Sequence, residues 1–99
     1  MIKGSNIVVL GAGKSGVGAG ILAKQIGAEV LVSDHSTISE IHQKTLNDYD
    51  VLWEHNGHTE KRILSADLVV KSPGISDLNP IVKKLDQKGV PVILSLIHI

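Results

Sequence analysis

The sequence contains no cysteine and almost no aromatic residues. The absence of cysteine excludes a disulfide framework and a thiolate metal site. It also means that cysteine usage gives no information about the redox compartment of the protein. Trp53 and Tyr49 are the only aromatic residues. Proteins that bind single-stranded nucleic acid stack bases on several aromatic rings, and this chain lacks the rings for such a platform.

The sequence also lacks an excess of charge of either sign and a long apolar run. Ten basic and ten acidic residues cancel, so we expect neither nucleic acid nor an anionic membrane as a partner. No apolar run approaches the roughly 18 residues of a transmembrane helix, and the first residues do not resemble a signal peptide. The 99 residues, 42% of them hydrophobic, predict one small cytoplasmic domain over residues 1–99.

What the sequence does contain is a glycine-rich turn between an apolar strand and a helix. Ile7 to Leu10 form the strand, and Gly11, Gly13 and Gly16 follow it. Such glycines permit a tight turn, close approach of the backbone to a phosphate, and close packing of the helix on the strand. Asp34 lies 18 residues beyond Gly16, at the end of the next apolar run, where it can accept a hydrogen bond from a ribose hydroxyl or a base N–H.

Gly13-Lys14-Ser15 also resembles the end of an ATP-binding P-loop. That motif requires a glycine five positions before Gly13, where this sequence has Val8 within the strand. The sequence therefore excludes a P-loop here. Lys14 has two interpretations that remain open: its charge can face a phosphate, or the side chain can be solvated. Ser15 can donate a hydrogen bond to a phosphate, cap the helix, or do both.

Strand and helix patterns alternate along the whole chain, which predicts an α/β fold with a doubly wound, Rossmann-like, five-stranded parallel sheet. The expected strands are residues 7–10, 29–33, 49–53, 67–71 and 90–96. The expected helices are residues 15–26, 37–46 with a capping box at its start, 60–64 capped by Thr59, and 80–88 capped by Asn79. The second helix is expected to bury Ile38, Ile41 and Leu46.

The carboxyl ends of parallel strands meet at one edge of the sheet, so three loops are expected to form one cleft there. The predicted site consists of Gly11, Gly13, Lys14, Ser15, Gly16, Asp34, His35, Ser36, Ser72 and Gly74. A branched side chain at Gly13 is expected to fill the space that a diphosphate needs and to strain the backbone.

Other polar residues of the sequence carry weaker signals. His55 and His58 have a spacing that metal ligands can have, but no third ligand except Glu54 or Glu60 lies near, so no metal site is predicted. His58 is expected to organise the start of the helix at residues 60–64. Ser72 lacks the sequence context of a catalytic nucleophile.

Four segments together resemble the N-terminal domain of the Mur ligase family, most closely its D-glutamate-adding members. They are Val8–Gly16, Val32–Asp34, Gly57–His58 and Ala66–Ile75, and the resemblance covers about residues 4–93. The Ser-Pro-Gly-Ile stretch at residues 72–75 is the most specific part.

The resemblance implies cytoplasmic peptidoglycan synthesis, in which ATP with Mg activates a carboxylate and the amine of D-glutamate attacks it. It also implies that this domain binds UDP-N-acetylmuramoyl-L-alanine, needs no cofactor of its own and carries no catalytic residue. Residues 13–15 are then expected near the nucleotide, residues 34–36 near the uracil, and Gly74 beside the diphosphate. The central ATP-binding and C-terminal domains of the family are not in this sequence, so we expect a fragment that is inactive alone.

Two other interpretations remain open. The same glycines and Asp34 also suit a free-standing NAD-binding module of an oxidoreductase or sensor. A domain that binds only another protein is the third possibility, and it would be favoured if no nucleotide binds.

Overall fold

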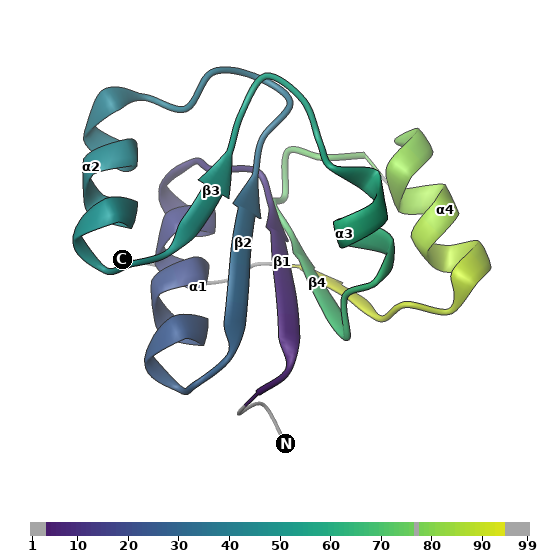
Figure 1. Ribbon diagram of the computed structural model, residues 1–99. Coiled ribbons are helices and arrows are strands. Elements are labelled where there is room, and N and C mark those ends of the chain that lie inside the picture. Colours follow the sequence, from purple (N-terminus) through teal and green to yellow (C-terminus); the bar gives the residue numbers. More distant parts are fainter. Residues whose placement is uncertain (1–3, 77, 95–99) are drawn as a thin grey trace.

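Parallel strands form a single sheet in the computed structural model, which describes residues 4–76 and 78–94 (Figure 1). The elements in chain order are β1 (Asn6–Leu10), α1 (Lys14–Gln25), β2 (Glu29–Ser33), α2 (Glu40–Asp48), β3 (Leu52–Glu54), α3 (Glu60–Leu64), β4 (Leu68–Lys71), α4 (Pro80–Lys88) and β5 (Val92–Leu94). Within these described residues the five strands lie in the order β3-β2-β1-β4-β5, and all neighbours are parallel. The predicted Rossmann-like fold is confirmed.

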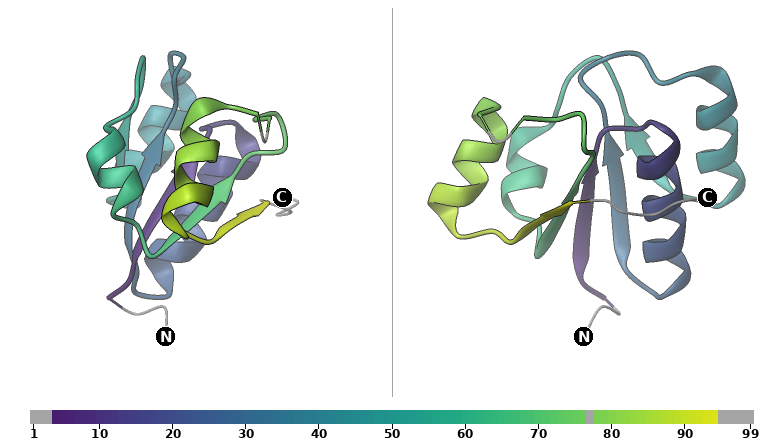
Figure 2. Two further views of the ribbon diagram at one scale, coloured as in Figure 1. Left: turned by 90° about the vertical axis from the view of Figure 1, so that its right-hand side faces the viewer. Right: turned by 180° about the vertical axis from the view of Figure 1, so that it is seen from behind.

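The helices cover both faces of the sheet (Figures 1 and 2). Helices α1 and α2 pack on one face and α3 and α4 on the other, because successive residues of the central strand point to opposite sides. Ile7 and Val9 of β1 enter the core beneath α1 and α2, whereas Val8 and Leu10 enter the core beneath α3 and α4. No helix of the described residues is long and apolar enough to cross a bilayer.

The predicted start of α2 is wrong. The cap lies two residues later than the capping box suggests, at Ser39, which accepts a hydrogen bond from the backbone N–H of His42. Thr37, the expected cap, instead donates its hydroxyl to the side chain of Asn56. Ile38 lies before the helix and is buried, so it does not share a helical face with Ile41, whose side chain, expected in the core, is 78% exposed.

The third strand and third helix also differ from the prediction. Strand β3 begins only at Leu52, because Tyr49 ends α2 and Asp50 takes a positive φ of 58°. Thr59 does hold the N-cap position of α3, yet its side chain makes no capping bond with that helix. Its hydroxyl donates instead to Glu54, five positions earlier at the end of β3.

The last helix agrees with its sequence signals. Asn79 caps α4 by accepting from the N–H of Ile81, Pro80 occupies the first turn, and Gly89 ends the helix in the left-handed region. Strand β5 begins at Val92, two residues after the predicted start; the predicted residues 95 and 96 lie outside the described residues.

Candidate functional site

The predicted loops converge at the carboxyl edge of the sheet, where the strand order reverses between β1 and β4. The N–H of Gly11 donates to the carbonyl of Ser33, and the N–H of Ser72 donates to the carbonyl of Leu10, so the loops after β1, β2 and β4 are bound together. They enclose a cleft of about 160 Å³. Its lining comprises Gly11, Gly13, Asp34, His35, His58, Ser72, Gly74 and Ile75.

Six of the ten predicted residues therefore line the cleft, and four do not. Lys14 and Ser15 lie in the first turn of α1, just beyond the glycine turn. Gly16 is buried behind that turn, and Ser36 is exposed beyond the cleft rim. Ser15 does not cap the helix through the N-cap position, which Gly13 occupies.

The three glycines of the turn differ in what a side chain would meet at each position. Gly11 has a φ of +96°, and a Cβ there would lie 2.7 Å from the Cβ of Ser72. A Cβ at Gly16 would overlap the carbonyl oxygen of Gly11, so α1 can approach β1 only because this residue is glycine. Gly13 has a φ of −74° and open space where a Cβ would lie. The expectation that a side chain at Gly13 strains the backbone is thus wrong, although the open space remains.

Replacing Gly16 with alanine is expected to lower the free energy of unfolding by about 1–3 kcal/mol, because the added methyl must push α1 away from the turn. The matched variant Gly13→Ala adds the same methyl in open space. Alanine restricts the unfolded chain but is a poorer N-cap residue than glycine, so the two effects oppose each other and we expect a change within about 0.5 kcal/mol. Urea unfolding followed by circular dichroism compares the two. Equal stability of both variants would refute the close packing at Gly16.

Asp34 joins two of the loops. One carboxylate oxygen, Oδ2, accepts from the N–H of Ala12 at 2.8 Å, and Oδ1 accepts from the N–H of Ser36 at 2.9 Å. The neighbouring His35 places its Nδ1 3.7 Å from Oδ1, and its side chain is 77% exposed, against 19% for Asp34. Because each carboxylate oxygen can accept more than one hydrogen bond, Asp34 retains capacity for a ligand donor.

The N-terminus of α1 adjoins the cleft. Within the described residues no side chain caps this twelve-residue helix through its N-cap, and its first turn contains no acidic residue. The backbone N–H groups of a first turn and the helix dipole attract anions. The local electrostatics therefore suit a phosphate beside Gly13.

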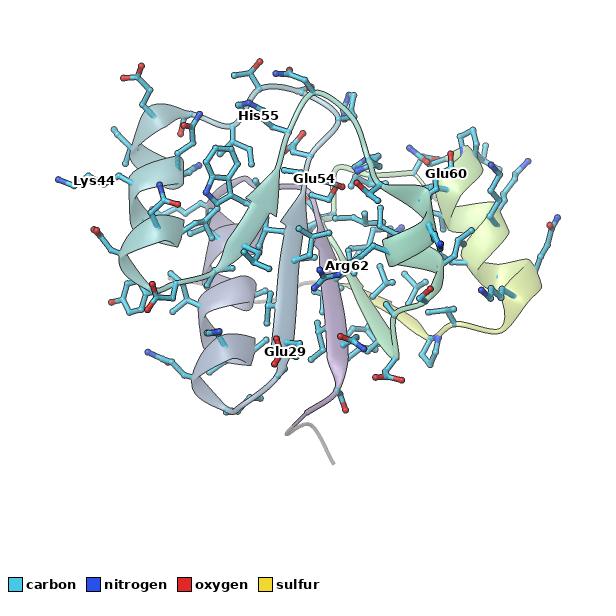
Figure 3. All side chains as sticks on the ribbon, viewed as in Figure 1. Glu29, Lys44, Glu54, His55, Glu60 and Arg62 are labelled. Atoms are coloured by element: carbon cyan, nitrogen blue, oxygen red, sulfur yellow. The ribbon has the colours of Figure 1, made fainter. Side chains whose placement is uncertain are left out.

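A polar cluster that the sequence reasoning missed lies at the ends of β2 and β3. Ser33 and Glu54 face each other in the strand register, and Figure 3 shows Glu54 at the upper end of β3. The Ser33 hydroxyl, fully buried, donates to Glu54 Oε2 at 2.6 Å and lies 2.6 Å from Nδ1 of His58. Ser33 is the one polar residue among the buried positions of β2, and this was a signal that the sequence offered. Its partners, however, depend on a strand register that the sequence does not reveal.

Glu54, rather than His58, organises the start of α3. Its two carboxylate oxygens accept from the N–H of Thr59 at 2.7 Å and from the Thr59 hydroxyl at 2.6 Å. Partial burial would raise the pKa of Glu54, but the hydrogen bonds from Ser33 and Thr59 outweigh burial, so the pKa lies below its usual value. Burial lowers the pKa of His58 despite the opposing charge of Glu54. Near neutral pH the carboxylate is therefore charged and the imidazole neutral.

His55 and His58 do not share a site. His55 Nδ1 accepts from the N–H of Ile38 at 3.2 Å, and its ring packs edge-on against Trp53. The described residues contain no group of three or more histidine, aspartate or glutamate side chains placed to hold a metal ion.

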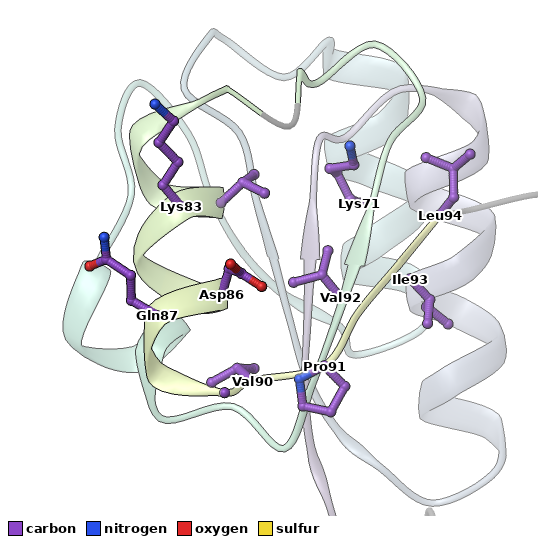
Figure 4. Close-up of a pocket in the computed structure, with 11 residues that line it drawn as sticks. Lys71, Lys83, Asp86, Gln87, Val90, Pro91, Val92, Ile93 and Leu94 are labelled. Atoms are coloured by element: carbon purple, nitrogen blue, oxygen red, sulfur yellow. The ribbon is translucent and has the colours of Figure 1, made fainter.

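A larger cavity, of about 760 Å³, lies between α4 and β5 (Figure 4). Val82, Asp86, Val90 and Val92 are part of its lining, which includes none of the ten predicted residues. Its walls are not the loops at the strand-order reversal, so size alone does not make it a nucleotide site. The smaller cleft is therefore the candidate site.

Sequence comparison decides the family. The family described as "Mur ligase MurD-like, N-terminal domain" matches residues 5–94. The chain belongs to this family. Its MurD-like sequence is 49% identical over 87 residues to a UDP-N-acetylmuramoylalanine–D-glutamate ligase of Bacteroides fragilis, covering 88% of this chain and 20% of that protein. A ligase of the same name from Christiangramia forsetii is 44% identical over 90 residues, covering 91% and 20%.

Solved structures show how widely the MurD-like fold occurs. A pseudomurein peptide ligase type C from Methanothermus fervidus superposes with a TM-score of 0.78 at 21% identity, covering 91% of this chain and 19% of that one. Dipicolinate synthase A chain from Bacillus subtilis gives a TM-score of 0.70 at 19% identity, covering 95% and 38%. At such identities the likeness shows the fold alone. The MurD-like assignment thus rests on sequence, and the chain spans about one fifth of the length of its curated relatives.

Proposed function

We propose that this chain is the nucleotide-binding N-terminal domain of a cytoplasmic, D-glutamate-adding Mur ligase and that its cleft binds the UDP group of UDP-N-acetylmuramoyl-L-alanine. The observation that carries the proposal is the junction of the glycine turn with the Ser72–Ile75 loop in a MurD-like sequence. In the full-length enzyme, further domains would bind ATP and Mg and the amino acid. This domain itself would supply binding and orientation.

The proposed roles follow from the chemistry of each loop. The diphosphate would lie over Gly13 at the N-terminus of α1, where Lys14 and Ser15 can contribute a charge and a hydroxyl. Ser72 and Gly74 would border the diphosphate from the loop after β4. Residues 34–36 would meet the uracil, with the remaining acceptor capacity of Asp34 directed to a base N–H.

The 99-residue chain is expected to bind UDP-N-acetylmuramoyl-L-alanine at least about tenfold more tightly than NAD, a difference of ~1.4 kcal/mol. Isothermal titration calorimetry with both ligands tests this, and UDP against ADP separates recognition of the base from recognition of the diphosphate. Equal or tighter binding of NAD would favour the oxidoreductase or sensor interpretation. Absence of binding to any nucleotide would favour a protein-interaction domain.

A further inference from the structure

The buried Ser33 hydroxyl determines where the proton of His58 lies. Ser33 Oγ has one hydrogen and lies 2.6 Å from both Glu54 Oε2 and His58 Nδ1. An ionised carboxylate can only accept, so the hydroxyl hydrogen points to Glu54. The oxygen then has only lone pairs to offer to His58, and Nδ1 must carry the proton that completes the second hydrogen bond.

The other ring nitrogen of His58 is consequently an acceptor. Nε2 lies across the ring from the Ser33 contact, and no hydrogen bond joins it to any residue that the structure describes. His58 belongs to the lining of the cleft, and its ring centroid lies 6.4 Å from that of His35 on the neighbouring loop after β2. A neutral imidazole with its proton on Nδ1 offers one lone pair at Nε2.

We propose that Glu54 and Ser33 are positioning residues that hold His58 with its proton on Nδ1, so that Nε2 accepts a hydrogen bond from the nucleoside part of the ligand. The identity of that ligand rests on the proposed function. A uridine nucleotide has donors only in its imide N–H and ribose hydroxyls, whereas its diphosphate oxygens accept. His58 therefore recognises the nucleoside and leaves the diphosphate to the glycine turn.

The charges around His58 allow the neutral form that this role needs. Burial has the largest effect and, with His35, opposes protonation of the ring, whereas Glu54, Asp34 and Glu60 favour it; the pKa of His58 is lowered. Acidification protonates Nε2 and converts the acceptor into a donor. Affinity for a donor on the ligand must then fall as the pH drops through that pKa.

The tautomer is measurable without any ligand by two-bond ¹H–¹⁵N NMR of the histidine rings in the 99-residue chain. Wild-type His58 is expected to show a protonated Nδ1 and an unprotonated Nε2 at pH 7.5. Ser33→Ala and Glu54→Gln are expected to shift the proton population toward Nε2, while His42, on α2, stays unchanged as the internal control. A wild-type His58 with its proton on Nε2 would overturn the inference.

Two amide variants separate the ring nitrogens in binding. His58→Asn keeps an N–H where Nδ1 lies and removes the group at Nε2, so affinity for UDP-N-acetylmuramoyl-L-alanine should fall about three- to tenfold. His58→Gln places an amide oxygen near the Nε2 position and should restore most of that loss. Equal affinities of wild type and a folded His58→Asn would overturn the inference.

The dependence of ligand affinity on pH distinguishes a hydrogen bond from the ligand to His58 from a purely structural role of this residue. The diphosphate diester of the UDP-sugar does not titrate near neutrality. On acidification through the lowered pKa of His58, affinity should therefore fall in the wild type relative to His58→Gln, which keeps His35 and the rest of the cleft. Affinity that rises on acidification in the wild type but not in His58→Gln would mean that protonated His58 contacts the diphosphate, and would overturn the inference. If the wild type binds no uridine nucleotide, both the proposed function and the ligand role of His58 fail, whereas the NMR result still decides whether Ser33 and Glu54 fix the ring.

Discussion

Replacing Gly13 with valine is expected to abolish nucleotide binding while leaving the domain folded. The side chain would project into a cleft of about 160 Å³, at the point where we place the diphosphate. The backbone tolerates valine, because Gly13 has a φ of −74° and is extended at ψ −173°. We expect at least a 100-fold loss of affinity for UDP-N-acetylmuramoyl-L-alanine, or ~2.8 kcal/mol, measured by calorimetry.

A graded series distinguishes filling of the cleft from damage to the fold. Gly13→Ala adds one carbon to the same open space and should give an intermediate loss, and thermal unfolding of both variants should match that of the wild type. Lys14→Ala is the comparison variant for charge, because it removes the lysine charge and leaves the space beside Gly13 open. Wild-type affinity in a folded Gly13→Val chain would refute the placement of the diphosphate over the glycine turn.

The second large effect is the absence of turnover by the 99-residue chain. Transfer of a phosphoryl group from ATP requires a cradle for the β- and γ-phosphates and a bound metal ion. The one Gly-Lys-Ser sequence follows a strand in which Val8, at the place of the missing glycine, is 1% exposed and packed in the core. With ATP, Mg, UDP-N-acetylmuramoyl-L-alanine and D-glutamate, phosphate release and product formation are expected to equal those of a sample without protein.

The complete ligase of Bacteroides fragilis, assayed in parallel, provides the positive control for that experiment. Binding of the UDP-sugar by the same preparation, measured separately, shows that the chain is folded and competent. Turnover above background that disappears in Lys14→Ala would place the chemistry in this domain and overturn the fragment interpretation.

The sequence by itself determined the fold class and the position of the cleft. Alternating apolar strands and amphipathic helices specify a parallel α/β sheet, because strands such as Glu29–Ser33 must be covered on both faces. Local signals were also sufficient at α4, where Asn79 and Gly89 act through contacts within a few residues. The sequence also identified Gly11 and Gly16, where a side chain would collide with the turn itself, whereas Gly13 faces open space.

Only the tertiary structure decided which polar groups meet. Thr37 and Thr59 satisfy local capping patterns, yet the Thr37 hydroxyl donates to Asn56, 19 positions away, and the Thr59 hydroxyl donates to Glu54 at the end of β3. The pairing of β3 beside β2 aligns Ser33 with Glu54 and brings His58 to Ser33, across 25 positions of sequence. The register between strands depends on the packing of both faces of the sheet, so no local sequence pattern predicts it. The sequence therefore determined the cleft, and strand register determined the direction in which its histidine presents a lone pair.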